Sequence, residues 1–248
     1  MKTFFIVADV HSFYDEMIAA LNEQGYDRED PDHIFVCLGD LLDRGEKPLE
    51  CLDFVNSLPP KQKLLIRGNH EDLIEDCIYR RSFLYRDLHN GTEKTVIALS
   101  GVSYEQFYEG DYRPYLVSLQ EHPALQQYLS DLVDYAELGD YILVHGWIPH
   151  ASESPSHDWR RGNWYHARWA NGMEEWQNGF RPRGKTVICG HWHASWGHAI
   201  IDKSSPEFGP GSDFSPFSRK GILAIDACTA YSHKVNCVKL EFPEEKEG

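Results

Sequence analysis

The sequence predicts an α/β fold built on two β-sheets. In the first third of the chain, apolar runs at Phe4–Ala8, Ile34–Leu38 and Leu64–Ile66 each precede a stretch with helical periodicity. This alternation is typical of βαβ units and a largely parallel sheet. Later apolar runs have no long helices between them, which favours a second and more antiparallel sheet. The 248 residues, 42% of them hydrophobic, suffice for a sizeable core, and we expect one domain over residues 1–248.

Each of the first three strands leads into a predicted helix. Ser12 is expected to cap the first helix, with Asp15 at the capping-box position. Pro48 fits the first turn of the second helix, because its missing N–H has no intrahelical partner there. The third helix follows Leu64–Ile66 at once, and the spacing of Leu73, Ile74, Cys77 and Ile78 gives it an apolar face.

The second part of the chain begins after a helical stretch near residues 116–135. Five further strands are predicted, at Tyr141–Val144, Thr186–Cys189, His198–Ile201, Ile222–Ile225 and Val235–Leu240. All seven tryptophans fall between Trp147 and Trp196, and most lie in a weakly periodic insertion at about residues 147–185. These rings either anchor the insertion to the body of the protein or belong to a lid that shapes a substrate pocket.

Charge and composition exclude several classes of protein. The formal net charge is −15, and no Lys/Arg-rich block marks a footprint for a long nucleic acid. A small anionic substrate stays possible, because bound metal ions can reverse the local field. No apolar run is long enough for a membrane span or a signal sequence. The six cysteines contain no CxxC pair, so we expect a reduced, cytoplasmic protein.

Polar side chains cluster where five of the predicted strands end. These are Asp9 and His11, then Asp40, Asp43 and Arg44, then Asn69 and His70, then His145, and finally His191 and His193. In open α/β sheets the loops after the carboxyl ends of strands gather at one edge. Imidazoles, carboxylates and an amide oxygen without a thiolate suit first-row transition metals. Their number fits two ions that share a carboxylate, roughly 3.5–4 Å apart.

The five blocks DVH, GDLLDRG, GNHE, HG and GHWH resemble the signature blocks of the calcineurin-like metallophosphoesterases. GDLLDRG and RGNHE are similar to the Ser/Thr phosphoprotein phosphatase branch, especially its bacterial and phage members and the symmetrical diadenosine tetraphosphatases. The resemblance implies a four-layer α-β-β-α sandwich with two mixed sheets. The sequence departs from that branch at Ser12, where glycine is usual, at Trp147, where a second glycine is common, and at His193, where the branch often has GHT.

The resemblance also implies roles for individual residues. Asp9, His11 and Asp40 would hold the first metal ion, with His193 as a possible fourth ligand; Asp40, Asn69, His145 and His191 would hold the second. The ions would be divalent or trivalent, manganese first, with Fe, Zn, Ni or Co as alternatives. The implied nucleophile is a metal-bridging hydroxide. His70 would protonate the leaving group and Asp43 would orient it. Arg44 would bind the phosphate, together with Arg168 or one of its alternatives, Arg160 and Arg161.

Three functional hypotheses follow. The first is a phosphomonoesterase of the Ser/Thr protein phosphatase type, acting on a phosphoprotein or a small phosphorylated molecule. The second is a hydrolase of dinucleoside polyphosphates or cyclic nucleotides, in which the tryptophans stack a base. The third is a non-catalytic metal-binding module, which is disfavoured because Asp43, Arg44 and His70 are all present. The sequence leaves the oligomeric state open.

Overall fold

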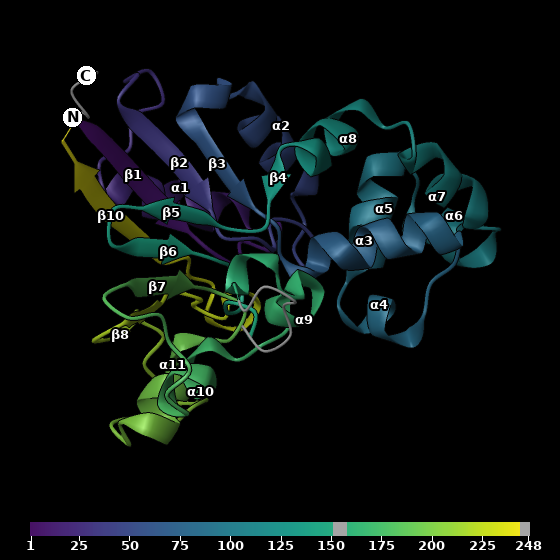
Figure 1. Ribbon diagram of the computed structural model, residues 1–248. Helices are drawn as coiled ribbons and strands as arrows, with labels where there is room; N and C mark the ends of the chain where they lie inside the picture. The colour runs from purple at the N-terminus through teal and green to yellow at the C-terminus, as the bar shows by residue number, and fades with distance from the viewer. Residues whose placement is uncertain (151–157, 244–248) are drawn as a thin grey trace.

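Two five-stranded sheets face each other in the computed structural model, which describes residues 1–150 and 158–243 (Figure 1). Sheet A contains, in spatial order, β10 (Cys237–Phe242), β1 (Lys2–Val7), β2 (His33–Cys37), β3 (Lys63–Ile66) and β4 (Leu132–Val133). Strands β1 to β4 are parallel, and β10 pairs antiparallel with β1. The predicted parallel sheet is therefore present, with an additional antiparallel edge strand.

Sheet B is less antiparallel than the sequence suggested. Its strands, in spatial order, are β5 (Ala136–Leu138), β6 (Tyr141–Leu143), β7 (Thr186–Cys189), β9 (Ile222–Ala224) and β8 (Phe217–Arg219). The three central strands β6, β7 and β9 are parallel, and only the edge strands β5 and β8 are antiparallel. Parallel neighbours need long crossovers, and the described parts of these connections contain short helices, loops and the edge strand β8.

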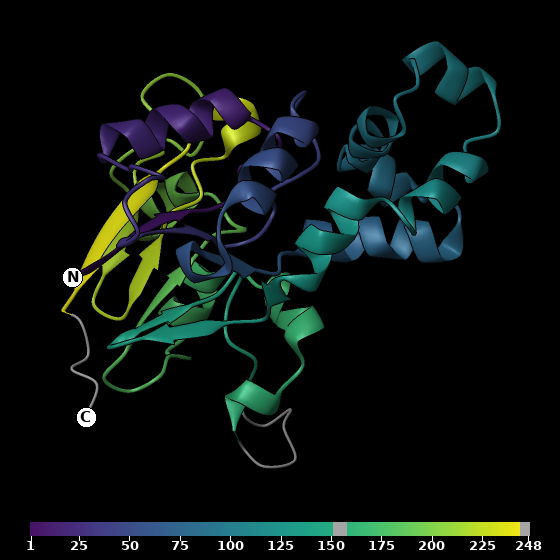
Figure 2. The ribbon, with the colours of Figure 1, turned by 90° about the horizontal axis from the view of Figure 1, so that it is seen from above.

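Successive apolar residues along a strand of sheet A face two different hydrophobic cores, one on each side of the sheet. In β1, Ile6 faces sheet B, whereas Phe5 and Val7 face the helices α1 (Tyr14–Glu23) and α2 (Pro48–Ser57). A strand buried on both faces has a continuous apolar sequence, which explains the run Phe4–Ala8. Figure 2 shows α1 and α2 over the outer face of sheet A, with sheet B on its other side.

The outer face of sheet B is covered by the tryptophan-rich segment. This segment contains α9 (Trp164–Arg168) and α10 (Gly172–Gln177), and Trp147 is buried against the sheet in a third core. Trp159, Trp164, Trp176 and Trp196 pack against the same core. These rings act as anchors. The layers are thus helix, sheet, sheet and helix, which confirms the predicted four-layer α-β-β-α sandwich with two mixed sheets.

A group of helices projects beside the β3–β4 edge of sheet A (Figure 1). It comprises α3 (Asn69–Arg80), α4 (Tyr85–His89), α5 (Thr92–Ser100), α6 (Tyr104–Glu109), α7 (Arg113–Leu119) and α8 (Pro123–Ser130). The single helical stretch predicted near residues 116–135 is therefore two helices followed by β4. In the described part of the chain, no helix is long and apolar enough to cross a membrane.

Two of the predicted strands are wrong or misplaced. His198–Ile201 lies in a π-helix, Gly197–Ile201, which continues directly from α11 (Ala194–Trp196). The predicted strand Val235–Leu240 is β10, which joins sheet A beside β1 instead of the second sheet. Short apolar runs fit a strand or a buried helix equally well, and periodicity does not show which sheet a strand joins. In the described ranges, the remaining short helices are η1 (Pro60–Gln62), η3 (Trp159–Arg161) and α12 (Thr229–Ser232).

Ser12 does not cap the first helix. Its backbone N–H donates to the carbonyl of Leu41 at 2.8 Å, which holds the residue in a left-handed conformation with φ of 62°. The cap position of α1 is taken by Phe13 without a side-chain hydrogen bond. Within the described residues, the buried Ser12 Oγ has no hydrogen-bond partner. The loop after β1 is thus fixed by the loop after β2 and not by the helix that follows it.

Candidate metal centre and active site

The loops after β1, β2, β3, β6 and β7 meet at one edge of the sandwich and are joined across the two sheets. The backbone N–H of His191 donates to Asp9 Oδ2 at 2.8 Å, and His145 Nδ1 donates to the carbonyl of Leu38 at 2.7 Å. Both bonds join a residue of the sheet B loops to one of the sheet A loops. The strand-end residues predicted from the sequence are therefore brought into one buried region, with the exceptions described below.

The backbone of this region is strained at the residues that carry the polar groups. Asp9, His11, Asp40 and His191 have φ values of 51°, 52°, 54° and 63°. Asp43 and Arg44 are also left-handed. Residues other than glycine adopt this conformation only when surrounding contacts hold them there, at a cost of order 1–3 kcal/mol each. Such strain commonly gathers at functional sites.

Two clusters of potential metal ligands share one carboxylate. His11, Asp40 and His70 form the first, and Asp40, His145 and His191 form the second; in each, the ligand atoms lie within 4.8 Å of one another. Asp40 Oδ2 lies 3.8 Å from His11 Nε2, and Asp40 Oδ1 lies 3.4 Å from His145 Nε2. Asn69 Oδ1 lies 2.8 Å from the same nitrogen of His145. A carboxylate between two sets of donors is the geometry that a bridging ligand requires.

The histidine rings are oriented as metal ligands are. His11 Nδ1 faces the carbonyl of Leu42 at 3.1 Å, His145 Nδ1 faces that of Leu38, and the ring of His191 is hydrogen-bonded to the carbonyl of Trp169. A neutral imidazole that donates one N–H to a carbonyl presents the lone pair of its other nitrogen. Here those lone pairs of His11 and His145 face the oxygens of Asp40, an arrangement that is favourable only with a cation between them.

The pKa values agree with a site built for cations. Burial, with nearby positive charge on Arg44 and His70, holds the pKa of His11 well below its usual range. Burial also lowers the pKa of His145 strongly and that of His191 to about 4. The rings are therefore neutral near pH 7, as metal binding requires. Burial, with the negative charge of Glu71, raises the pKa of Asp40 to about 7 although His70 and Arg44 act against it. The donor set and its orientation thus fit two metal ions.

His70 lies next to the shared carboxylate and is paired with Asp43. Its Nδ1 is 2.8 Å from Asp43 Oδ2, and Thr92 and Thr95 of α5 donate hydroxyl hydrogen bonds to the two oxygens of Asp43. Burial opposes protonation of His70, but the charges of Asp40 and Asp43 outweigh it and raise its pKa. The imidazole is therefore held in one orientation and favoured in its protonated form.

Arg44 lies beside His70. Its Nη2 is 3.2 Å from His70 Nε2 and 3.3 Å from Asn90 Oδ1, and its side chain has no carboxylate partner among the described residues. Arg44 follows Asp43 in the left-handed turn of the GDLLDRG block. Because these contacts use only Nη2 and no carboxylate of the described residues pairs with the guanidinium, its other donors can bind an anion.

Arg168, predicted as the second phosphate-binding arginine, forms ion pairs with two aspartates. Its Nε and Nη2 contact Asp72 at 2.7 and 3.1 Å, and its Nη1 contacts Asp134 at 2.7 Å. This pairing argues against the predicted role, because a phosphate would have to displace a bound carboxylate. Of the alternatives, Arg160 pairs with Glu137 at 2.6 Å, and Arg161 is exposed.

His193 is not brought into either cluster. Its Nδ1 is 2.9 Å from Ser195 Oγ, and its Nε2 is 3.4 Å from Glu207 Oε1. Partial burial lowers its pKa to about 4. The geometry therefore does not support His193 as the fourth ligand of the first ion.

Glu71 is a residue of the site that the sequence analysis left without a role. Its buried carboxylate accepts four hydrogen bonds: from the backbone N–H of Asp40, Leu41 and Gly68 at 3.0, 3.1 and 2.8 Å, and from Tyr128 Oη at 2.7 Å. These bonds fix the turn that carries Asp40. The clue was available in the GNHE block, where a glutamate follows Asn69 and His70 at the end of a buried strand.

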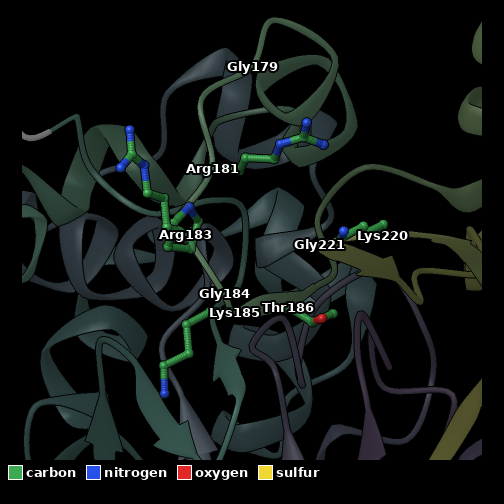
Figure 3. Close-up of a pocket in the computed structure, with 9 residues that line it drawn as sticks. Gly179, Arg181, Arg183, Gly184, Lys185, Thr186, Lys220 and Gly221 are labelled. Carbon is green, nitrogen blue, oxygen red and sulfur yellow. The ribbon is translucent and has the colours of Figure 1, made fainter.

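A cavity of about 510 Å³ lies elsewhere on the protein and gathers four basic residues, Arg181, Arg183, Lys185 and Lys220. Three of them lie within residues 181–185, and the turn between β8 and β9 adds Lys220. In Figure 3, the side chains of Arg181, Arg183 and Lys185 point in different directions. Lys185 Nζ donates to the carbonyl of Gly139 at 2.6 Å, and the Arg181 guanidinium lies over the Trp176 ring. These cations do not converge on one position.

Comparisons with known proteins agree with this geometry. The model of the family described as calcineurin-like phosphoesterase matches residues 2–195. The chain belongs to this family. The family description is that of a phosphoesterase.

Individual relatives cover only part of the chain. A bis(5'-nucleosyl)-tetraphosphatase [asymmetrical] of Bacillus velezensis is 39% identical over 72 residues, which are 26% of this chain and 29% of the relative. A symmetrical bis(5'-nucleosyl)-tetraphosphatase of Actinobacillus succinogenes is 38% identical over 79 residues, 32% of this chain and 27% of the relative. The matches thus span less than a third of the length of these relatives.

Solved structures share the fold over most of the chain. A protein serine/threonine phosphatase of Saccharomyces cerevisiae matches with a TM-score of 0.52 and 15% identity, over 99% of this chain and 82% of that one. At this identity the match shows the fold alone.

Replacing Glu71 by Gln should destabilise the protein. Glutamine keeps one oxygen, so at least one of the buried donors at Asp40, Leu41, Gly68 or Tyr128 would face an amide NH₂. We expect a loss of about 2 kcal/mol or more in the free energy of unfolding, measured by urea denaturation. Tyr128→Phe, which removes one donor and leaves the carboxylate, should cost less, about 0.5–1.5 kcal/mol. Equal stability of E71Q and wild type would contradict this role of Glu71.

Replacing Asp43 by Asn should lower the pKa of His70. His70 binds its proton more tightly because Asp40 and Asp43 raise its pKa, so removing one of these charges moves its titration to lower pH. The measurement is an NMR pH titration of the metal-stripped protein. Asp76→Asn is the matched control. Asp76 lies on helix α3, as His70 does, but it pairs with Arg80 and Arg86. An unchanged His70 titration in D43N would show that Asp43 does not favour its protonation.

Proposed function

We propose that this protein hydrolyses phosphate monoesters at a dinuclear metal centre of the Ser/Thr protein phosphatase type. The observation that carries the proposal is that Asp40 belongs to both ligand clusters, with the His70–Asp43 pair and Arg44 beside them. Asp9, His11 and Asp40 would hold one ion, and Asp40, Asn69, His145 and His191 the other. When bound, the two ions would supply Lewis-acid charge at the phosphate and activate water. Manganese is the first metal to test, because the ligands are oxygen and imidazole nitrogen without thiolate.

The residues of the chain would divide the remaining work between them. Arg44 would donate to a phosphate oxygen and hold the ester against the shared edge of the clusters. His70, protonated through its bond to Asp43, would give its proton to the leaving oxygen. Thr92 and Thr95 would keep Asp43 in place by occupying its other lone pairs. The roles of Asp43, Thr92 and Thr95 use contacts that are already formed.

A second candidate function is hydrolysis of a dinucleoside polyphosphate or cyclic nucleotide. Two observations favour it. The curated relatives named above are bis(5'-nucleosyl)-tetraphosphatases. In addition, Trp169 and Trp192 are each 37% exposed, and their rings lie 5.9 and 6.0 Å from the ring of His191, in a position to stack a base. An assay panel of aryl phosphate, phosphopeptide, dinucleoside polyphosphate and cyclic nucleotide, with added Mn²⁺, separates the two functions.

Chelation should abolish hydrolysis of an aryl phosphate, and Mn²⁺ should restore it. Asp40→Asn should lower both metal content and activity, because the shared negative charge between the clusters is lost. Metal content is measured by elemental analysis of the same sample that is assayed. The exposed Asp15→Asn serves as the control and should change neither. Full activity of metal-free wild type, or two ions per chain with normal turnover in D40N, would refute the proposed centre.

Replacing His70 by Asn should separate acid catalysis from metal binding. His70 Nε2 and His11 Nε2 both lie 3.8 Å from Asp40 Oδ2, so distance alone also permits His70 to be a ligand. As an acid, H70N should keep its metal and lose roughly 10²–10⁴-fold in kcat on an alkyl phosphate. The loss should shrink on p-nitrophenyl phosphate, whose leaving group hardly needs a proton.

His145→Asn is the matched comparison for that experiment. His145 faces Asn69 and Asp40 as a ligand does, so H145N should lose metal and fail on both substrates alike. Loss of metal in H70N, or an equal loss on good and poor leaving groups, would assign His70 to the metal site instead.

A further inference from the structure

Asp226 is a buried carboxylate that the proposed chemistry does not use. It follows β9, as Asp9 follows β1 and His191 follows β7, and it is only 5% exposed. Asp226 directly follows the apolar run Ile222–Ile225, which is the same sequence pattern as at the other strand ends of the site.

The backbone holds Asp226 against the loop that carries His191. The N–H of Ile225 donates to the carbonyl of Cys189 at 2.9 Å, and the N–H of Ala194 donates to the carbonyl of Asp226 at 2.8 Å. The pairing of β7 with β9 therefore continues past the strands to both sides of the Gly190–His191 turn. Asp226 is fixed where β7 and β9 end.

Asp9, which follows β1 of sheet A, contacts the same Gly190–His191 turn. Its Oδ2 accepts the N–H of His191, and it approaches Gly190 so closely that a side chain at Gly190 would collide with it. Asp226 holds the other side of this turn, because its carbonyl accepts the N–H of Ala194, and the negative charges of Asp9 and Asp226 repel each other. Two carboxylates from different sheets thus lie within electrostatic reach of each other.

The protein compensates the charge of Asp226 only in part, through the more distant charge of Arg44. Asp226 Oδ1 accepts the N–H of Cys228 at 2.6 Å, and Asp226 has no ion pair within the described ranges 1–150 and 158–243. Arg44 is the basic group that faces both Asp9 and Asp226, and Asp40 adds a third carboxylate. A buried anion without an ion-pair partner is costly, and a cation bound beside it would offset this cost.

We propose that Asp226 is a further residue of the metal centre, which acts through its negative charge to strengthen the binding of a divalent cation on the Asp9 side. This inference rests on the metal centre proposed above. Asp226 is a positioning residue in this role, since it acts on the ion through Asp9 and the field of the site. Within the described residues its side chain has one hydrogen bond, from the N–H of Cys228, so we expect the fold to tolerate its replacement.

The test compares two variants of Asp226 in Mn²⁺ titrations of metal-stripped protein by calorimetry. Asp226→Asn keeps the size of the side chain and an acceptor for the Cys228 N–H but removes the charge, whereas Asp226→Ala removes both. Both variants should bind Mn²⁺ about tenfold or more weakly than wild type. The Tm of metal-stripped D226N should equal or exceed that of wild type, because a buried and only partly compensated anion is removed.

Asp213→Asn is the matched control. Asp213 Oδ1 accepts the N–H of the residue two positions ahead, Ser215, at 2.9 Å, as Asp226 does with Cys228, but its side chain is 45% exposed. D213N should bind Mn²⁺ like wild type. Its unchanged affinity shows that loss of a surface charge or of a local turn does not produce the effect.

The outcomes separate this inference from the proposed function. If D226N binds Mn²⁺ like wild type and only D226A is altered, Asp226 merely supports its turn and the inference is wrong. A marked drop in the Tm of metal-stripped D226N would overturn it as well. If wild type itself binds no Mn²⁺, the proposed metal centre fails, and this inference fails with it.

Discussion

The carboxylate of Glu71 holds the turn on which the candidate site depends. It accepts backbone hydrogen bonds from Asp40 and Leu41 after β2 and from Gly68 after β3, so two neighbouring strand ends are tied to one buried group. Asp40 then keeps a left-handed conformation and presents its oxygens to His11 on one side and His145 on the other. A single buried acid thereby sets the position of the residue that both ligand clusters share.

The other residues of the candidate site lower the stability of the fold, and the surrounding hydrophobic cores must offset this loss. Left-handed residues, buried carboxylates with raised pKa values and neutral imidazoles facing oxygens are each unfavourable in the isolated protein. They persist because three apolar cores hold the strands that deliver them. Bound cations would relieve much of this cost, so metal binding and stability are expected to be linked.

In the proposed enzyme, the choice of substrate would depend on parts of the molecule outside the shared fold. The yeast phosphatase and this chain have the same fold at 15% identity, and a fold of this kind hosts different substrates. Near the site, this chain has its own arrangement: Arg168 pairs with Asp72 and Asp134 where a phosphate contact was predicted, and two partly exposed tryptophans flank His191. These surroundings, more than the ligand clusters, bear on the choice between a phosphomonoester and a nucleotide.

The sequence by itself determined the strands of both sheets that carry the site and the polar residues at their ends, because burial on two faces gives continuous apolar runs and the ligands follow them directly. It also pointed to Asp43 beside His70 through the family resemblance. Tertiary structure decided what depends on partners distant in the chain. It placed β10 in sheet A, turned His198–Ile201 into a π-helix and took Ser12 out of the helix cap. It also paired Arg168 with acids and brought Asp226 to Asp9, because a side chain's role depends on which charges the fold sets next to it.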